Sequence, residues 1–588
     1  MQARPTLWEA HFLRVAALDA MGRNTESWRA RLAAAFLTAE AGIPELGLRW
    51  FEKGKLERFE LAARCDRSGE GAHDLARDLM ALGGTSAAGT ALKRLMAWRG
   101  PEAIPLDPLL PRVLSERDAV TLAIHMRQAG TVRRALDLLE MFEPSPTIER
   151  ALRGPAQDLR AIDGLIALPS LGTEPIDTVP GTSLYLLHNS LPLNSGGYAT
   201  RTHGLLKGLA AAGRNVIPIT RPGYPDPERS FEQDISKSSD VTVDDITYRR
   251  IIGEVTATPR QDLQGFVETY ARGLEPHIRS AKPTIIHAAS NWWNGIAGIA
   301  VARRYGLRSI YEVRGLWEVT KSSRVDAWQE SEVYHADVAY ETLAAREADR
   351  VFVITEALRD EMVSRGVSAD KMSVVPNAVD TTAFFPRQRN RELAKELGIK
   401  NATVVIGFAG SMTFYEGLGD LLVAVAQISE TTNVPLAVLL VGDGPVRDEL
   451  QSSARELGIE QLTIFTGRVP HEAVMEYLSL MDVTPFPRQP LPVTEMVSPL
   501  KPLESMASGV AVLASDVAAL RELVPPGTGL LHRKGDVEDL TEQLRMLVED
   551  RDLRDSLRTA ALEWVRNNRT WEVVAAEVAR VYDALEAG

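Results

Sequence analysis

The chain is 588 residues long, with 45% hydrophobic and 25% charged residues, a composition that is ordinary for a globular protein. At about 100–200 residues a domain, this length predicts three or four domains. The formal net charge of -13 argues against broad nucleic-acid binding, which usually requires a basic surface. The one cysteine, Cys65, excludes an intrachain disulfide and indicates a reducing compartment.

The first residues do not resemble a targeting segment. Residues 1–14 lack the basic stretch, the apolar core and the small-residue cleavage site of a signal peptide. No stretch of the chain approaches the roughly 20 apolar residues that a membrane-spanning helix needs. We therefore expect a cytoplasmic protein, and peripheral attachment at the inner face of the cell membrane stays open.

Residues 1–175 are predicted to form an all-α N-terminal domain, because Ala, Leu, Arg and Glu dominate and apolar residues recur at helical spacing. Residues 120–124, Gly130 and residues 132–139 predict a helix, a turn and a second helix. Helical hairpins of this kind occur in solenoids, but no clean repeat period is present.

Further helices are predicted at residues 43–51 and 92–96, and the Pro/Gly-rich residues 169–181 predict a linker. The hairpin character of the N-terminal domain suggests a docking role. Its partner would be another molecule or a second copy of the chain.

From Thr182 onwards, short apolar strands alternate with helices, which predicts two α/β domains over residues 180–385 and 386–570. The predicted strands are residues 183–188, 215–220, 284–287, 309–313, 350–355, 403–410, 436–441, 462–466, 483–486 and 510–514. Ligands of parallel sheets bind at the carboxyl ends of strands, so we expect a site in a cleft between the two domains. Residues 571–588 predict an amphipathic helix that packs across both domains or caps the second one.

Three strand-to-helix loops contain glycines that let a ligand approach the backbone closely. Gly196 and Gly197 follow the first predicted strand, and a loop with Gly410 and Ser411 opens the second α/β domain. Gly442–Asp443–Gly444 follows another strand, where a structural turn is the favoured interpretation.

Residues 492–509 form the most informative segment. Ser498 followed by Pro499 predicts a helix start, with a capping hydroxyl and proline at the first position. Lys501 in the first turn would add charge for a phosphate, and Glu504 would accept hydrogen bonds from sugar or ribose hydroxyls. The alternative is a solvated surface helix on which both charges are incidental.

In combination, these motifs resemble a known family. Residues from about 183 to 588 look like a retaining glycosyltransferase of family 4, with the GT-B architecture of two facing Rossmann-like domains. The segments that carry the resemblance are residues 196–197, 375–380, 408–417, 442–445, 465–469 and 503–509. The helical N-terminal part lies outside it.

The resemblance implies a nucleotide-sugar donor held mainly by the second α/β domain. Glu504 matches the family's ribose-binding glutamate. Its partner, eight positions earlier, would fall on Met496, whereas the glutamate here is Glu495. Either the loop has shifted by one residue, or backbone amides around Val497 and Ser498 take over the sugar contacts.

Other donor contacts are implied for Gly197, Gly410, Ser411, Arg468 and Val469. Many members of the family also have an arginine and a lysine after the glycine that matches Gly410, but this chain offers Ser411 and Glu416. We expect Lys501, together with Arg314 or Arg468, to stabilise the leaving diphosphate instead.

In the first α/β domain, Arg314 matches a loop that faces the donor in part of the family, and the alternative is a salt bridge with Glu312 or Glu318. His287 falls where relatives often have a His-x-His pair, although a lone histidine at a strand end is as often structural. Tyr198, Ser290 and Asn291 are candidate acceptor or sugar contacts. Asn377 and Asp380 match the interdomain hinge.

The resemblance implies transfer with retention of anomeric configuration, in cell-surface polysaccharide or glycoconjugate biosynthesis. A component of such a polysaccharide-assembly system, or the acceptor, would then be a partner of the N-terminal helices. It implies no metal and no cofactor beyond a nucleotide-sugar substrate, with a UDP-sugar favoured over a GDP-sugar. Two alternatives stay open: a nucleotide-sugar epimerase or phosphorylase, and a catalytically inactive scaffold.

Overall fold

The computed structural model describes residues 92, 96, 100–104, 106, 110–225, 240–251 and 258–587. It divides into two compact units. One comprises residues 1–166, 258–263 and 327–339, and the other comprises residues 167–257, 264–326 and 340–588. The first unit therefore takes in two short segments that the predicted 1–175 boundary did not include. The predicted helix at residues 43–51 lies outside the described residues.

The described part of the first unit is helical, as predicted. It contains a 3-10 turn, Pro101–Ala103, and the helices α7 (Leu110–Val113), α8 (Glu116–Gln128), α9 (Val132–Glu140) and α10 (Pro146–Ile162). Ser115 and Ser145 cap α8 and α10, since each hydroxyl accepts a hydrogen bond from a backbone amide three residues on. The predicted helix–turn–helix is α8 and α9, which turn at Gly130 with a φ of 105°.

Residues 258–263 and 327–339 complete this unit through buried contacts. Arg127 forms an ion pair of 2.6 Å with the buried Asp158 and donates a hydrogen bond to the carbonyl of Arg260. Trp328, in the 3-10 turn Trp328–Glu330, belongs to the same small apolar cluster as Val132.

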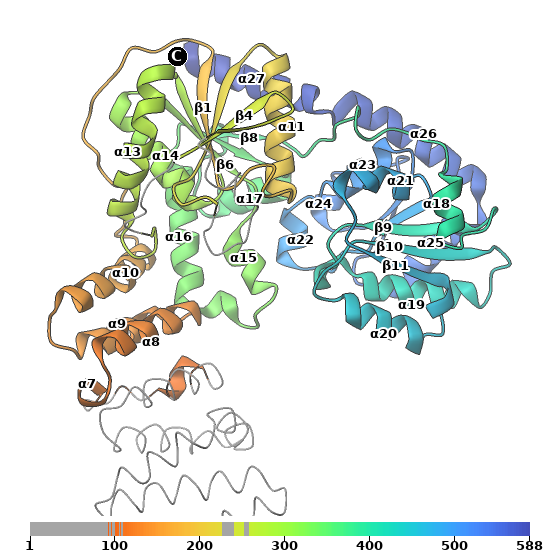
Figure 1. Ribbon diagram of the computed structural model, residues 1–588, viewed down its shortest axis with the longest axis horizontal. Helices are drawn as coiled ribbons and strands as arrows, with labels where there is room; N and C mark the ends of the chain where they lie inside the picture. The colour runs from red at the N-terminus through yellow and green to blue at the C-terminus, as the bar shows by residue number, and fades with distance from the viewer. Residues whose placement is uncertain are drawn as a thin grey trace, which may run out of the picture. The chain divides into compact units, whose positions relative to one another are not determined.

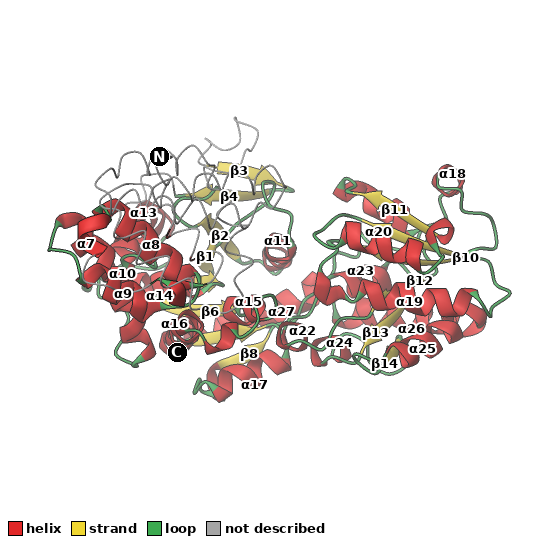
Figure 2. Cartoon of the chain, turned by 90° about the horizontal axis from the view of Figure 1, so that it is seen from below, coloured by secondary structure: helices red, strands yellow, loops and turns green. Residues whose placement is uncertain are grey.

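The second unit contains an eight-stranded sheet with the order β3-β4-β2-β1-β5-β6-β7-β8 (Figures 1 and 2). Its strands are β1 (Thr182–Leu187), β2 (Asn215–Thr220), β3 (Asp240–Val243), β4 (Ile246–Arg250), β5 (Ile285–Ala289), β6 (Arg308–Val313), β7 (Arg350–Val353) and β8 (Met372–Val374). All neighbours pair in parallel except the β3–β4 hairpin. The strand order reverses between β1 and β5, and this reversal places a crevice at their carboxyl ends.

Helices connect these strands. They are α11 (Gly197–Ala211), α13 (Leu263–Ala281), α14 (Trp292–Tyr305), α15 (Trp317–Ser322), α16 (Glu332–Glu347) and α17 (Glu356–Ser364). β1 and β5 are buried along their whole length, as expected for strands covered on both faces.

A six-stranded sheet with the order β11-β10-β9-β12-β13-β14 follows. Its strands are β9 (Val404–Ala409), β10 (Leu436–Val441), β11 (Thr463–Gly467), β12 (Val483–Phe486), β13 (Ala511–Ser515) and β14 (Leu530–His532), all parallel. Its helices are α18 (Arg391–Glu396), α19 (Leu418–Ser429), α20 (Arg447–Glu456), α21 (Val474–Leu478), α22 (Pro492–Met496), α23 (Lys501–Ala507), α24 (Ala518–Arg521), α25 (Val537–Glu549) and α26 (Arg551–Asn568). Here the order reverses between β9 and β12.

The predicted fold class is confirmed, since two parallel-sheet α/β domains follow a helical region. Every strand predicted from the sequence is present to within a residue or two, and β3, β4, β8 and β14 were not predicted.

The last helix, α27 (Trp571–Ala587), does not cap the second α/β domain. It lies along α11 of the first α/β domain, as Figure 1 shows in blue beside yellow. Trp571, Val574 and Tyr582 are buried in the same apolar cluster as Tyr185 of β1. The chain therefore returns from the second sheet to complete the core of the first.

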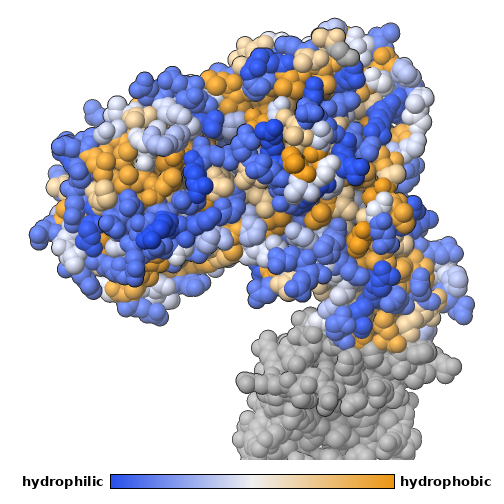
Figure 3. All heavy atoms as spheres, turned by 180° about the vertical axis from the view of Figure 1, so that it is seen from behind, coloured by the Kyte–Doolittle hydropathy of each residue, from blue (hydrophilic) through white to orange (hydrophobic). Residues whose placement is uncertain are grey.

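Figure 3 shows one face on which hydrophilic and hydrophobic residues are interspersed. No helix within the described ranges combines the length and the apolar character that spanning a membrane requires.

Candidate functional site

A cavity of about 600 Å³ lies between the two α/β domains of the second unit. The first α/β domain contributes Ser195, Gly196, Gly197, Tyr198, Thr200, Arg201, Arg314, Ile354 and Asn377 to its lining. The second contributes Ala409, Gly410, Ser411, Glu416, Arg468, Val474, Val497, Ser498, Pro499, Leu500, Lys501 and Glu504. The loops after β1 and β9 both follow strands at a reversal of strand order, where α/β sheets bind ligands.

The glycine loop after β9 forms one wall of the cavity, because glycine lets its backbone pack closely against neighbouring residues. Gly410 has a φ of 147°, and a Cβ there would lie 2.4 Å from Cε of Lys501. A Cβ on Gly442 would lie 2.1 Å from the Gly410 carbonyl oxygen. The turn at Gly442 therefore has the structural role expected of it, and it supports the loop that faces the cavity.

Lys501 lies across this loop and is ion-paired. Its Nζ is 2.8 Å from Oε1 of Glu416 and 4.5 Å from the centre of the Phe408 ring. The other carboxylate oxygen of Glu416 lies 3.3 Å from Nε of the buried Arg488. Burial alone would raise the pKa of Glu416, but Lys501 and Arg488 lower it. Sequence reasoning missed Arg488, which no motif marks.

Ser498 does not begin a helix. α22 ends at Met496, and α23 begins at Lys501 with Leu500 as its uncapped N-terminal neighbour. Ser498 instead meets the first α/β domain, because the Asn377 amide donates hydrogen bonds to its carbonyl at 2.8 Å and its hydroxyl at 3.2 Å. The predicted helix start is therefore wrong, because Ser498 holds the domain junction instead.

Glu504 reaches the cavity from the first turn of α23. Burial raises the pKa of its carboxyl to about 7, and the nearby Lys501 only partly opposes this shift. Arg468 lines the same cavity, and its side chain is exposed. Among the described residues no ion pair of Arg468 is present. Val469 packs against the core of the second sheet and is not in the lining.

Glu495 lies away from the cavity lining. Its Oε2 accepts a hydrogen bond of 2.7 Å from the amide of Ala518, and its Oε1 pairs with Lys534 at 2.7 Å. The expectation of a donor contact at Glu495 does not fit this position. Val497 and Ser498 do line the cavity, as the backbone alternative requires.

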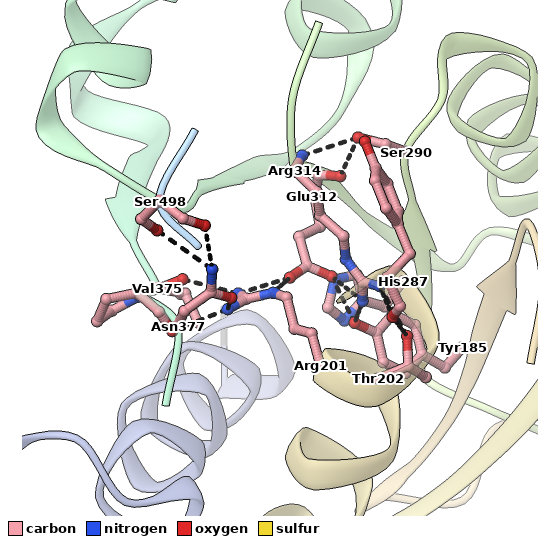
Figure 4. Close-up of polar contacts among 12 residues, drawn as sticks. Tyr185, Arg201, Thr202, His287, Ser290, Glu312, Arg314, Val375, Asn377 and Ser498 are labelled. Carbon is pink, nitrogen blue, oxygen red and sulfur yellow. Dashed lines mark hydrogen bonds and ion pairs between the residues drawn. The ribbon is translucent and has the colours of Figure 1, made fainter. Parts of the chain in front are cut away.

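In the first α/β domain, one buried carboxylate holds two arginines (Figure 4). Glu312 accepts 2.9 and 2.8 Å hydrogen bonds from Arg201 and Arg314, and Tyr185 donates a further one. Burial would raise the pKa of Glu312, but the two guanidinium groups hold it well below its usual range. Both arginines line the cavity, so this cluster carries one positive charge in excess there. Sequence reasoning named Arg314 and its pairing with Glu312 but missed Arg201.

The remaining predicted residues of the first α/β domain lie in the interior. His287 is fully buried, with Nδ1 2.7 Å from the Tyr582 hydroxyl and Nε2 3.4 Å from Glu312. Burial lowers its pKa, which keeps the ring neutral. Because His287 has no surface on the cavity, the expectation that it touches substrate does not fit.

Ser290 and Asn291 are also fully buried and are not in the cavity lining. The Ser290 hydroxyl donates to the Glu312 carbonyl at 3.0 Å and accepts from the Arg314 amide at 2.8 Å. Ser290 therefore orients the Arg314 loop, and its expected sugar contact does not fit this position. Asn291 forms no side-chain hydrogen bond within the described ranges.

Asn377 and Asp380, predicted as hinge residues, lie at the junction. Asn377 accepts a 3.0 Å hydrogen bond from Arg201 and bridges to Ser498 in the second α/β domain (Figure 4). Arg201 also donates to the carbonyls of Val375 and Pro376. Asp380 pairs with Lys207 at 2.9 Å; burial would raise its pKa, but Lys207 and Thr382 hold it at about 2. In the part of the chain that the structure describes, no cluster of metal-ligand side chains is found.

Two facing α/β domains, each with a reversal of strand order at a shared cavity, define the class of GT-B glycosyltransferases. Residues 389–564 match the family model described as glycosyl transferases group 1. Residues 196–378 match the model of a glycosyl transferase 4-like domain. The chain belongs to the group 1 glycosyltransferases, and the resemblance seen in its motifs is confirmed.

Characterised proteins resemble the chain at low identity. An alpha-maltose-1-phosphate synthase of Mycolicibacterium smegmatis is 25% identical over 322 residues, 52% of this chain and 80% of that protein. A glycogen synthase of Mycobacterium tuberculosis is 24% identical over 415 residues, 68% of this chain and 93% of that protein. Both are glycosyl-group enzymes by name, which agrees with the class of transferase.

Solved structures support the fold. A sucrose-phosphate synthase from Thermosynechococcus elongatus aligns with a TM-score of 0.55 at 22% identity, covering 69% of this chain and 99% of its own. The Anabaena protein HepE in complex with UDP-glucose aligns with a TM-score of 0.51 at 17% identity, covering 68% of this chain and 99% of its own.

Proposed function

We propose that this glycosyltransferase moves a sugar from a UDP-sugar to a glycan acceptor with retention of anomeric configuration. The observation that carries the proposal is the cavity at both strand-order reversals, lined by Lys501, Arg468 and the surplus charge of the Glu312 cluster. Those cations suit a diphosphate, and the half-buried Glu504 suits a ribose.

The reaction needs no protein nucleophile in this proposal. The bond from the anomeric carbon to the diphosphate breaks, and the acceptor oxygen bonds to the same face of that carbon. The acceptor proton passes to an oxygen of the departing phosphate. The lining carboxylate Glu416 is tied to Lys501 and Arg488, so it suits electrostatic positioning better than attack.

UDP is favoured as the donor nucleotide because a protein of this fold, Anabaena HepE, is in complex with UDP-glucose. We also propose that the reaction requires no metal. The test is to incubate the full chain with UDP- and GDP-sugars, with and without a chelator, together with a panel of glycans. Nucleoside diphosphate release and the anomeric coupling constant of the product are the readouts. Absence of binding by every nucleotide sugar would refute the proposal.

Cell-surface polysaccharide or glycoconjugate synthesis is the pathway class we propose, with a cytoplasmic enzyme that attaches peripherally to the membrane. The first unit would dock the acceptor system or a second copy of the chain, since residues 1–166, which form most of it, lie outside both family matches. Deleting residues 1–166 should leave donor hydrolysis intact and reduce transfer to acceptor. Equal loss of both activities would contradict a docking role.

A catalytically inactive scaffold is the second candidate. It is favoured by Glu416, whose carboxylate forms an ion pair with Lys501. Glu416 lies in the loop after Gly410, where many members of the family have an arginine and a lysine. Complementation of a deletion strain by the Lys501→Ala and Glu504→Ala variants separates the two. Full complementation by both would support the scaffold, and loss of function with normal protein levels would support the enzyme.

A further inference from the structure

A chain of buried polar side chains runs from the last helix, α27, to the two arginines that line the cavity. The Tyr582 hydroxyl on α27 lies 2.7 Å from Nδ1 of His287, and Nε2 of His287 lies 3.4 Å from Oε2 of Glu312. Glu312 holds Arg314 through the same oxygen and Arg201 through the other one (Figure 4). Tyr582, His287 and Glu312, here called the α27 relay, are fully buried, and none of them is in the cavity lining.

The carboxylate at the end of the α27 relay fixes the direction of its hydrogen bonds. Burial would raise the pKa of Glu312, but the two guanidinium groups hold it well below its usual range, so this group is ionised. Nε2 of His287 forms no hydrogen bond of ordinary length to a described residue, and the polar group that it faces is Glu312. A hydrogen on Nε2 is attracted by that carboxylate, whereas a lone pair there would be repelled. Nδ1 is then an acceptor, and Tyr582 donates to it, because burial raises the pKa of Tyr582 and keeps its phenol protonated.

The imidazole of His287 is fixed by packing as well as by its polar contacts. It stacks on the ring of Tyr185, with the two centroids 4.2 Å apart, and it meets the ring of Phe352 edge-on. Tyr185 also donates a hydrogen bond to Glu312 and accepts one from Arg314. Because interiors of this kind are close-packed, a shift of the imidazole would be passed to the carboxylate and to Arg314 by both routes.

Tyr582 is held in place from the far end of α27. Arg214, which follows α11, has its guanidinium carbon 5.3 Å from the centre of the Tyr582 ring and forms an ion pair of 2.8 Å with Glu586. Glu586 also accepts hydrogen bonds from the Gly181 amide at 3.1 Å and the Thr284 hydroxyl at 2.5 Å, which precede β1 and β5. These partners belong to the first α/β domain, so the Tyr582 hydroxyl has a defined position relative to its sheet.

We propose that Tyr582 is a positioning residue for the transfer reaction: through the α27 relay, its hydroxyl holds the two cavity arginines in the geometry that stabilises the departing diphosphate. This inference rests on the proposed function, which places that diphosphate in the cavity. Attraction between opposite charges falls off slowly with distance, whereas stabilisation of a transition state requires donors at hydrogen-bond distance from the developing charge. Loss of the Tyr582 hydroxyl should therefore slow turnover much more than it weakens nucleotide binding. A tyrosine that serves the core alone would not produce this difference.

The test compares Tyr582→Phe with the wild type in the full chain. The substitution removes the hydroxyl and keeps the ring in its apolar cluster. We expect kcat for UDP release from a UDP-sugar to fall about tenfold, with the UDP Kd from titration calorimetry within twofold of wild type. Tyr270→Phe is the matched control, because Tyr270 is also a fully buried tyrosine of the first α/β domain and donates a hydrogen bond of 3.2 Å to Asn294. Tyr270 lies outside both the α27 relay and the cavity lining, so its variant should keep kcat within twofold.

The imidazole of His287 can also be observed directly. In protein labelled with ¹⁵N-histidine, the NMR shifts of the two ring nitrogens show which one carries the hydrogen, and His287→Gln identifies the His287 signals by their absence. We expect the hydrogen on Nε2 in the wild type and a displaced Nδ1 signal in Tyr582→Phe, because Nδ1 then loses its donor. Tyr270→Phe should leave both signals unchanged.

The outcomes separate the two proposals. A wild-type chain that binds neither UDP nor any UDP-sugar refutes the proposed function and, with it, the positioning role. Turnover by the wild type with an unchanged kcat in Tyr582→Phe overturns the positioning role alone. The same holds if Tyr270→Phe loses as much kcat as Tyr582→Phe, or if the UDP Kd rises in proportion to the loss of kcat. Hydrogen on Nδ1 of His287 in the wild type would also overturn it, since Tyr582 could then not donate to that atom.

Discussion

Single side chains set the charge balance of the cavity. Glu312 neutralises only one of its two arginines, and Glu416 neutralises one of Lys501 and Arg488. The second positive charge of each group is therefore available to a diphosphate, although the loop after Gly410 carries no arginine or lysine itself. This arrangement would let the cavity attract an anion even though the net charge of the chain is negative.

Removing the carboxylate of Glu416 should tighten UDP binding. Glu416→Gln leaves Lys501 and Arg488 with no counter-charge, so the cavity becomes more positive, and we expect UDP affinity to rise several-fold. The same change breaks a buried ion pair and should lower the free energy of unfolding by about 3 kcal/mol. Titration calorimetry and chemical denaturation measure the two effects. Glu495→Gln is the control, because its pair with Lys534 lies outside the cavity lining; unchanged or weaker UDP binding by Glu416→Gln would contradict the prediction.

The raised pKa of Glu504 predicts that UDP affinity depends on pH. Burial raises the pKa of its carboxyl to about 7, and only the ionised carboxylate accepts two hydrogen bonds from ribose hydroxyls. UDP affinity should therefore rise as the pH increases from 6 to 8. The second phosphate ionisation, at a pKa of about 6, contributes in the same direction. Glu504→Gln keeps the phosphate contribution and should lose the rest, so parallel pH profiles for the two proteins would refute this role.

Individual site residues could be predicted only where their signal is local. Lys501, Glu504, Gly410 and Gly197 lie in motifs that read directly from the chain, and all four line the cavity. Arg201 and Arg488 were missed because their partners, Glu312 and Glu416, are distant in sequence and the pairing exists only in the folded chain.

Close packing between loops requires glycine at particular positions, because a Cβ there would clash with a neighbouring segment. Gly442→Ala would place a Cβ 2.1 Å from the Gly410 carbonyl and should displace the loop that faces the cavity. We expect at least a tenfold loss of UDP affinity and a lower unfolding midpoint. Gly419→Ala is the control, since nothing lies within 4 Å of the Cβ that alanine would add. Within a helix such as α19, alanine is also more favourable than glycine by about 1 kcal/mol. Similar behaviour of the two variants would contradict the structural role of Gly442.

At the junction of the two α/β domains, we expect one substitution to lower kcat without a large change in the UDP Kd. Asn377→Ala removes the link from Arg201 to Ser498, while the groups of the second α/β domain that line the cavity keep their places. We expect kcat to fall at least tenfold with a UDP Kd within threefold of wild type. Lys207→Ala, which frees only Asp380 at the same junction, should have the smaller effect. A large loss of UDP affinity in Asn377→Ala would instead place this residue among the binding groups.

Elements were predictable where they are long and apolar. β1, β5, β9 and β10 are buried runs with unmistakable patterns. β8 and β14 have only three residues each, and the β3–β4 hairpin is half exposed, so their periodicity is too weak to read. The helix start expected at Ser498 was wrong because a tertiary contact, the Asn377 amide, takes the capping group.

The chain as a whole is tied together by its return to the first sheet. α26 packs on the second sheet, and α27 then completes the core of the first α/β domain. Arg214 and Glu586 fasten the far end of this helix with an ion pair of 2.8 Å, buried at the arginine. Neither alternative for residues 571–588 described this, because an amphipathic pattern shows that a face is buried but not which sheet covers it.

The contact between α11 and α27 can be tested by a reversal of sign. A Cβ on Gly204 would lie 2.2 Å from the Trp571 indole, so Gly204→Ala should lower the free energy of unfolding by about 1–3 kcal/mol through overpacking. Within a helix, however, alanine is intrinsically better than glycine by about 1 kcal/mol. In a Trp571→Ala background, where the indole is gone, the same change should therefore stabilise the protein. Chemical denaturation of the wild type, the two single variants and the double variant completes the double-mutant cycle and gives the coupling between Gly204 and Trp571. If Gly204→Ala had the same effect in both backgrounds, α27 could not be docked on α11 through Trp571.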